Sequence, residues 1–340
     1  MKENIDYILD FAKNILSIPS PSGYTTEVIQ FVDKEAQNLG YQTEQSKKGN
    51  LIITVPGRET FTLGLSGHVD TLGAMVRSIK ADGTLKFTPI GGPIWPTLDG
   101  EYCQIRTRDN LNYTGTFLST SPAVHVFKDA ATLARSPENM VVRIDELVKT
   151  KADTEKLGIA PGDFIFFDPK TTITKSGFIK SRFLDDKISV SILFGLLKHL
   201  KDNKITPRQS LKIIISTYEE VGHGASNIPT VDEIIAVDMG CIGDDLSCTE
   251  NQVSICCKDS SGPYNYEMIS KLVKISKDNK IDYATDIYPF YGSDVSAALR
   301  GGNDLKGALI GPGVHASHGM ERTHIDALTN TLKLLLNYIK

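Results

Sequence analysis

The chain has 340 residues, enough for one large domain and a smaller one, and its 40% hydrophobic and 23% charged residues are typical of a globular protein. The formal net charge is −4 and no Lys/Arg-rich block is present, which argues against nucleic acid or an anionic membrane as the main partner. The five cysteines form no C-x-x-C pair, and the first residues do not resemble a secretory signal, so we expect a reduced, cytoplasmic location.

The first 71 residues predict two helices followed by three strands. Apolar residues recur at helical spacing in residues 4–18, and two prolines and a glycine in SIPSPSG end that helix. A second amphipathic helix follows. Residues 41–46, 51–55 and 61–66 then alternate or run apolar as strands do, and the last of them leads into SGHVDTLG.

Residues 72–167 predict a small inserted β domain with the character of a barrel. The short runs LKFTPI, YCQIRT, TGTFLS and FIFFD are separated by Gly, Pro, Asn and Asp, which favour turns. One helical candidate lies near residues 144–150. We expect this insert to serve in oligomerisation or as a lid.

Helices and strands alternate again after the insert, which predicts an α/β fold. The expected fold has a mixed, largely parallel central sheet flanked by helices, built from residues 1–71 and 168–340 around the insert at 72–167. The elements expected in this part are helices at 184–201, 263–279 and 325–339 and strands at 211–217, 234–240, 281–288 and 306–311.

Five clusters place His, Asp or Glu at or just beyond the end of an apolar strand, the edge where open α/β sheets bind ligands. Three of the clusters also have a structural alternative: a surface turn for GHVD, a helix cap for LDD and a backbone cap for VDMG. The adjacent glutamates of YEEVG have no such alternative, because neighbouring carboxylates repel unless a cation or a shared proton relieves them. The candidate residues are His68 and Asp70 in GHVD, Asp185 in LDD, Glu219 and Glu220 in YEEVG, Asp238 in VDMG, and His315, His318 and His324 in HASHGMERTH.

Taken together, the clusters supply imidazole and carboxylate ligands without thiolates, a set that suits zinc, cobalt or manganese. A further glutamate lies beside a ligand glutamate. Metal-assisted hydrolysis needs both features, because a bound metal lowers the pKa of water and a nearby base accepts the proton.

The order GHVD, LDD, YEEVG, VDMG and SHGMERTH resembles the tetrahedral (TET) aminopeptidases, a family of co-catalytic dinuclear metallopeptidases that includes glutamyl aminopeptidases. The resemblance covers nearly the whole chain, including the β insert. It implies that Asp185 bridges two metal ions, that Glu219 is the general base and that Asp70 orients His68. The remaining ligands that it implies are His68 and Asp238 for one ion and Glu220 and a C-terminal histidine for the other.

Two points stay open at the level of sequence. The last ligand of the family is usually a His followed by a pair such as Ser-Pro and then an acid; His318, with Glu321 after it, fits this spacing best, and His324 is its rival. The preferred N-terminal residue of the substrate is also undetermined. Lys258 or Arg300 would favour acidic substrates if either residue lined the pocket.

The resemblance implies a metal-dependent aminopeptidase that acts on short peptides, holds two divalent ions per chain (zinc first, then cobalt or manganese) and assembles as a homododecamer. One alternative is a glycoside hydrolase of the endoglucanase kind, which would use two carboxylates with no metal between them. The other is a non-catalytic scaffold stabilised by metal, in which Glu219 would be idle.

Overall fold

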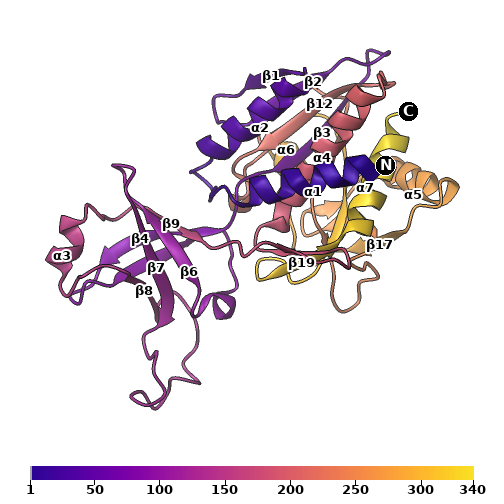
Figure 1. The fold of residues 1–340 in the computed structure, drawn as a ribbon. Coiled ribbons are helices and arrows are strands. Elements are labelled where there is room, and N and C mark those ends of the chain that lie inside the picture. Colours follow the sequence, from indigo (N-terminus) through magenta and orange to yellow (C-terminus); the bar gives the residue numbers. More distant parts are fainter. Residues whose placement is uncertain (1) are drawn as a thin grey trace. The chain divides into compact units, whose positions relative to one another are not determined.

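The computed structural model describes residues 2–340, which fold into two compact units (Figure 1). One unit comprises the chain up to Asp70 together with Lys170–Lys340, and the other comprises Thr71–Pro169. The first unit carries all the candidate ligands.

The first unit is built on a ten-stranded mixed sheet in which β12, β3, β13 and β18 run parallel at the centre. The pairs at its flanks are mostly antiparallel, so the predicted mixed, largely parallel sheet is confirmed. The spatial order is β1 (Gln42–Gln45), β2 (Leu51–Val55), β12 (Ser210–Ser216), β3 (Thr62–His68), β13 (Glu233–Val237), β18 (Lys306–Val314), β15 (Val253–Asp259) and β16 (Gly262–Pro263), with β14 (Gly240–Cys241) beside β18 and β17 (Tyr283–Ile287) beside β15.

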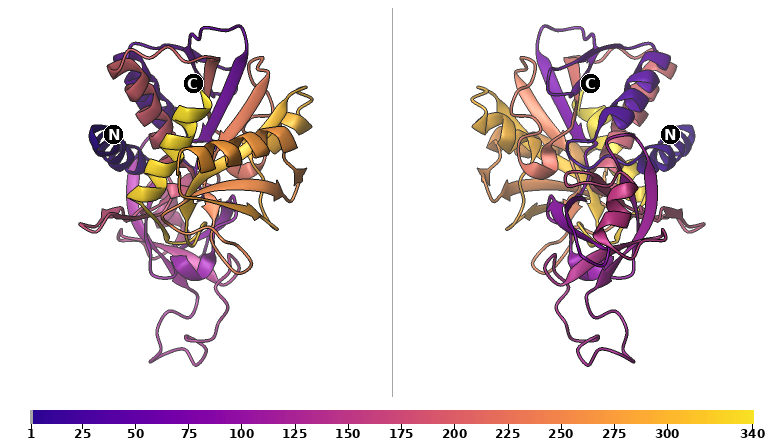
Figure 2. Two further views of the ribbon diagram at one scale, coloured as in Figure 1. Left: turned by 90° about the vertical axis from the view of Figure 1, so that its right-hand side faces the viewer. Right: turned by 90° about the vertical axis from the view of Figure 1, so that its left-hand side faces the viewer.

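Within residues 2–340, six α-helices belong to this unit. The helix α4 packs between the sheet and α1, so it is apolar around most of its circumference and buries nearly all of ISVSILFGLL. Figure 2 shows α5 and α7 side by side. The bounds are α1 (Lys2–Leu16), α2 (Thr26–Asn38), α4 (Leu184–Asp202), α5 (Tyr266–Asp278), α6 (Asp294–Arg300) and α7 (Ile325–Tyr338), and a small separate sheet holds β10 (Thr172–Ile173), β11 (Phe178–Ser181) and β19 (Glu321–His324).

Helices lie on both faces of the sheet. A Cβ at Gly67 of β3 would contact Val190 of α4, whereas Val295 of α6 packs with Ile234 and Leu309 of the strands beside it. Successive residues of a strand point to opposite faces, and Gly64, three positions before Gly67, faces Ile234. The helices α4 and α6 therefore cover opposite faces.

The second unit is a closed six-stranded barrel, as the predicted barrel-like insert requires. The helical candidate near 144–150 is wrong. Residues up to Ile144 continue a strand, and the helix begins only after Thr150, whose side chain forms a capping box with Asp153. The elements are β4 (Gly73–Ile79), β5 (Leu85–Ile90), a 3-10 turn at Trp95–Leu98, β6 (Tyr102–Arg106), β7 (Asn112–Ser119), β8 (Met140–Ile144), α3 (Lys151–Lys156) and β9 (Phe164–Phe167).

The elements β15 and α6 were not predicted from the sequence, because one is a short apolar run and the other has only seven residues. Cys256 lies in β15 and is buried, whereas Cys257, on the other face of the strand, is half-buried. None of the helices formed by residues 2–340 combines the length and the apolar character needed to cross a membrane.

The backbone crosses closely where β13 ends beside β18. A Cβ added at Gly311 would overlap the carbonyl oxygen of Asp238. The N–H of Asp238 donates to Ile310 O at 2.9 Å. Only glycine therefore permits this approach.

Gly311→Ala should lower the free energy of unfolding by about 1–3 kcal/mol, the usual cost of overpacking a core. Urea unfolding in the presence of a chelator measures the effect without a contribution from bound metal. Gly243→Ala is the matched control, because no atom lies within 4 Å of the added Cβ, and it should change stability by less than about 0.5 kcal/mol. Equal unfolding midpoints for the two variants would contradict the close approach.

Candidate metal centre

The candidate ligands meet at the carboxyl edge of the parallel strands. His68 is the last residue of β3, and the register places it opposite Ser216, the last residue of β12. Asp238 directly follows β13, and Glu219 follows β12 after a two-residue link. Parallel strands end at the same edge, so the strand register itself brings these side chains together.

Asp185 lies at the middle of the cluster. Its Oδ1 is 3.1 Å from Nε2 of His68, and its Oδ2 is 3.6 Å from Nε2 of His318. The carboxylate caps no helix, because the N-terminus of α4 has no side-chain cap. Burial alone would raise the pKa of Asp185, but the hydrogen bond from His68 and the charges of the two imidazoles hold the pKa below its usual value. One carboxylate thus presents a different oxygen to each histidine, as a bridging ligand must.

The two glutamates face different histidines. The Oε2 atom of Glu219 lies 3.7 Å from Nε2 of His68, and the Oε2 atom of Glu220 lies 3.6 Å from Nε2 of His318. Both residues belong to a 3-10 turn, Glu219–Val221. Their side chains point in different directions because of this turn, and not because successive residues of a strand point to opposite faces.

Asp70 organises this turn as well as the imidazole. Its Oδ1 accepts the N–H of Glu219 at 3.0 Å and its Oδ2 accepts that of Glu220 at 3.3 Å. The Nδ1 atom of His68 is 2.9 Å from the carbonyl oxygen of Asp70 and 3.6 Å from Oδ1. The main-chain oxygen therefore makes the closer contact to the ring, and the carboxylate positions both glutamates.

The cluster holds more negative charge than its imidazoles can balance. Burial raises the pKa of Glu219 and Glu220 well above the usual value for glutamate, and neighbouring carboxylates raise it further. Burial and the charge of Asp185 likewise raise the pKa of Asp238 to about 7. The Oε1 atom of Glu220 is buried and has no hydrogen-bond partner within residues 2–340. Divalent cations would relieve this repulsion and give Glu220 a partner, so the residues fit a metal site.

Two overlapping groups have ligand atoms within 4.8 Å of one another. One contains His68, Asp185 and Glu220, and the other contains His68, Asp186 and Asp238. Asp238 also accepts the N–H of the next residue, Met239, at 2.6 Å, so its predicted alternative as a backbone cap coexists with a place in the cluster. The strands β3, β12 and β13 lead to His68, Glu220 and Asp238, and each of them ends at one of the five motifs found in the sequence.

Two acidic residues at the cluster were given no role from the sequence. Asp186 accepts the N–H of His68 at 3.2 Å, and its other oxygen is buried without a partner within the described chain. Glu321 is buried and accepts the N–H groups of Asp185 at 3.0 Å and His318 at 3.1 Å. Asp186 lies in the motif LDD and Glu321 in HGME. The hydrogen bonds from His68 to Asp186 and from Asp185 to Glu321 join segments more than 100 residues apart, so the motifs alone do not reveal them.

His324, the rival of His318, lies in a different environment. Its ring packs edge-on against Phe178, and its Nε2 is 2.9 Å from Ser176 O. Its Nδ1 accepts the N–H of Asp326 at the start of α7. These contacts occupy both ring nitrogens with structural partners, so the structure groups His318, not His324, with Asp185 and Glu220.

Residues 49–334 match the sequence model of the M42 glutamyl aminopeptidases. A putative aminopeptidase of Bacillus subtilis, YhfE, is 49% identical over 336 residues, which cover 98% of this chain and 97% of that protein.

Two solved structures share the fold over almost the full chain. A TET aminopeptidase from a marine sediment archaeon of the Thaumarchaeota has a TM-score of 0.89 at 19% identity, covering 99% of this chain and 97% of its own. The TET1 peptidase of Pyrococcus horikoshii has a TM-score of 0.85 at 22% identity, covering 98% and 99%. That peptidase can assemble into a tetrahedron or a large octahedral shell.

Metal content should distinguish the two histidines. After dialysis against dilute zinc, we expect the unmodified chain to hold two equivalents and His318→Ala about one, because His318 faces only one side of Asp185. His324→Ala should retain both ions and lower stability by about 1 kcal/mol, since it loses a helix cap. Elemental analysis beside thermal unfolding measures both effects.

Asp185→Asn serves as the comparison in the same experiment and should reduce occupancy of both sites. Metal loss from His324→Ala with full retention by His318→Ala would reverse the assignment. A firm value of one ion or none in the unmodified chain would exclude a dinuclear centre.

Proposed function

The chain belongs to the M42 glutamyl aminopeptidase family and is an aminopeptidase, and on this premise we propose that the cluster at the sheet edge is its dinuclear catalytic centre. The observation that carries the proposal is the placement of Asp185, whose two oxygens face His68 and His318 separately. We assign His68 and Asp238 to one ion, Glu220 and His318 to the other, and Asp185 to both. The family is a family of peptide hydrolases, which favours this reaction over glycoside hydrolysis.

Zinc is the proposed metal, with cobalt or manganese as alternatives, because the ligands are imidazoles and carboxylates. When bound, two such ions would polarise the scissile carbonyl and lower the pKa of the attacking water. Activity measured after removal of metal and titration with each ion separately would identify the most effective one. A glycoside hydrolase that used carboxylates alone would be unaffected by the chelator.

Glu219 is proposed as the general base. Its Oε2 lies 3.7 Å from the imidazole of His68, and its backbone N–H donates to Asp70, so groups at the end of β3 position this glutamate. It takes a proton from the attacking water and passes it to the amine that leaves. The proposed role of Asp70 is to fix this turn and the ring of His68, which keeps the base and the ligand in one arrangement.

Substitution of the two glutamates tests this division of labour. Glu219→Gln keeps the size and polarity of the side chain but cannot accept a proton, so kcat should fall by about 10²–10⁴-fold. Bound metal and KM should change little. Glu220→Gln should instead weaken one metal site and make activity depend on added metal. Steady-state kinetics with parallel metal analysis separates the two outcomes.

A Glu219→Gln variant that keeps both ions and near-normal turnover would refute the base assignment. It would also revive the alternative of a metal-stabilised scaffold in which Glu219 is idle. Loss of metal from this variant would mean that Glu219 is a ligand and not the base.

We further propose that the chain assembles as a homododecamer, that the β unit Thr71–Pro169 takes part in this assembly or acts as a lid, and that the assembled protein is cytoplasmic. The support is the likeness to a TET1 peptidase that can form a tetrahedron or a large octahedral shell. Such a shell would admit only short peptides as substrates.

Sedimentation equilibrium of the full chain should give a mass twelve times that of one chain, unchanged on tenfold dilution. A monomer or dimer at micromolar concentration would contradict the dodecamer. Cleavage of long and short peptides by the same preparation would then show whether assembly limits the length of the peptides that the protein can cleave. Cell fractionation tests the location.

A further inference from the structure

Residues 217–224, which we call the glutamate loop, carry both Glu219 and Glu220 and have an exposed middle. The loop follows β12, and Val221 at the end of its 3-10 turn is 42% exposed. His223 is exposed as well. An exposed turn with few buried contacts is free to open locally. The two ends of the loop must therefore be held by other parts of the fold if the glutamates are to keep one arrangement.

The buried side chain of Asn50 contacts both ends of the glutamate loop. Asn50 directly precedes β2, and the pairing of Leu51 with Ile215 places it beside the end of β12. Its Nδ2 donates to Gly224 O at 3.0 Å, and its Oδ1 accepts the hydroxyl of Thr217 at 3.0 Å. A carbonyl oxygen only accepts, so the amide nitrogen must face Gly224 and the amide oxygen is left for Thr217. One side chain thus joins the first residue of the loop to the last.

The turn between β1 and β2, which presents Asn50, is itself fixed by hydrogen bonds. The hydroxyl of Ser46 accepts the N–H of Asn50 at 3.1 Å, and the N–H of Ser46 donates to Asn50 O at 2.9 Å. From the same turn, Nζ of Lys48 donates to the carbonyl oxygen of His223 and, at 3.1 Å, to Oγ of Ser226. The turn therefore contacts the glutamate loop with two side chains.

The helix α6 lies against the same loop. Asp294, the first residue of α6, is buried, and its Oδ2 accepts the hydroxyl of Ser216 at 2.7 Å. A Cβ added at Gly224 would lie 2.5 Å from Oδ1 of Asp294 and 3.0 Å from the backbone nitrogen of Glu219. The last residue of the loop is thus packed between α6 and the backbone of Glu219, so a shift at Gly224 would displace the proposed base.

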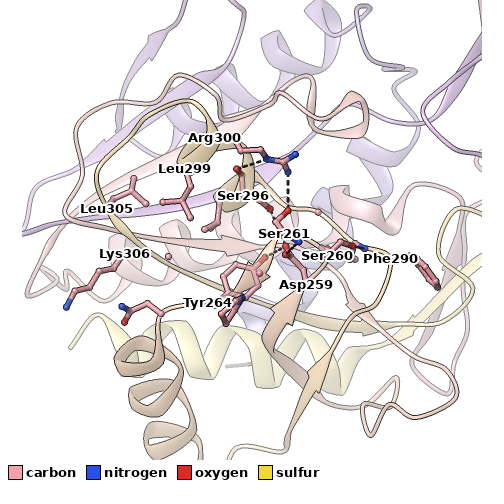
Figure 3. A pocket seen from close by; sticks show the side chains of 17 residues that line it. Asp259, Ser260, Ser261, Tyr264, Phe290, Ser296, Leu299, Arg300, Leu305 and Lys306 are labelled. Atoms are coloured by element: carbon pink, nitrogen blue, oxygen red, sulfur yellow. Dashed lines mark hydrogen bonds between the residues drawn. The ribbon is translucent and has the colours of Figure 1, made fainter.

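The start of α6 is anchored to β15. The carboxylate of Asp259 accepts the hydroxyls of Ser296 at 3.2 Å and Tyr264 at 2.7 Å. These three side chains line a cavity of about 880 Å³ beside α6 (Figure 3). Because the helix is tied to the sheet in this way, Asp294 is a fixed wall against which Asn50 holds the loop.

We propose that Asn50 is a positioning residue for peptide hydrolysis. By joining Thr217 to Gly224, it keeps the carboxylates of Glu219 and Glu220 in the arrangement that the metal centre requires. The inference rests on the proposed roles of these two glutamates. A misplacement of about 1 Å at a reacting group can cost about 10²-fold in rate, so the effect of Asn50 should be found in kcat.

Two substitutions of Asn50 test the proposal in the zinc-loaded full chain. Asn50→Ala removes both contacts, whereas Asn50→Asp keeps the contact with Thr217 and places an oxygen against the carbonyl oxygen of Gly224. Each should lower kcat by about 10- to 100-fold on the best of a panel of aminoacyl p-nitroanilides. At saturating zinc, KM and bound metal should change little.

Asn330→Ala is the matched control. Asn330 is a buried asparagine of α7 whose amide donates to Asn251 O at 2.9 Å. Its substitution should lower the unfolding midpoint and leave kcat unchanged. Thr217→Val adds a coupling test, because it should lower kcat in the unmodified chain but cause no further loss when Asn50→Ala is already present.

Hydrogen exchange gives a readout that does not depend on catalysis. In Asn50→Ala, backbone N–H groups of residues 217–224 should exchange faster than in the unmodified chain, while those of β12 should not. Normal kcat in Asn50→Ala with both ions bound, an equal loss of kcat in Asn330→Ala, or unchanged exchange in the loop would overturn the proposal. Failure of the proposed function has a different signature: the unmodified metal-loaded chain would hydrolyse no amide, or Glu219→Gln would hydrolyse them at the normal rate, and the exchange measurement would still decide whether Asn50 holds the loop.

Discussion

Carboxylates gathered at a buried sheet edge repel one another, and burial removes the water that would screen them. Asp185, Glu219, Glu220 and Asp238 are held in this condition. The groups that face them include two imidazoles, the hydroxyl of Ser317 and several backbone N–H groups. The raised pKa values of Glu219, Glu220 and Asp238 express the imbalance that remains. A divalent cation would relieve this repulsion, so the arrangement fits a metal site.

The fold supports this arrangement with contacts that do not themselves take part in chemistry. The parallel register of β3 and β12 sets His68 against the end of the strand that leads to Glu219. Asp70 fixes the turn of the glutamates, and Glu321 fixes the backbone of Asp185 and His318 together. Ligands that are held by strands and by buried hydrogen bonds keep their geometry when the substrate changes.

The sequence by itself determined the fold class and the sheet edge at which the candidate ligands meet, because apolar strands followed by His, Asp or Glu are local patterns. It also predicted a barrel-like β insert from its short runs and turns. The sequence did not reveal that Glu219 and Glu220 lie in a 3-10 turn, that Asp186 and Glu321 complete the cluster, or that β15 and α6 exist. Only the tertiary structure separated His318 from His324, since the two differ in the partners that distant segments bring to them: Asp185 and Glu220 for one, Phe178 and Ser176 for the other. Such contacts depend on how the chain path folds back on itself, which the spacing of residues within a motif does not encode.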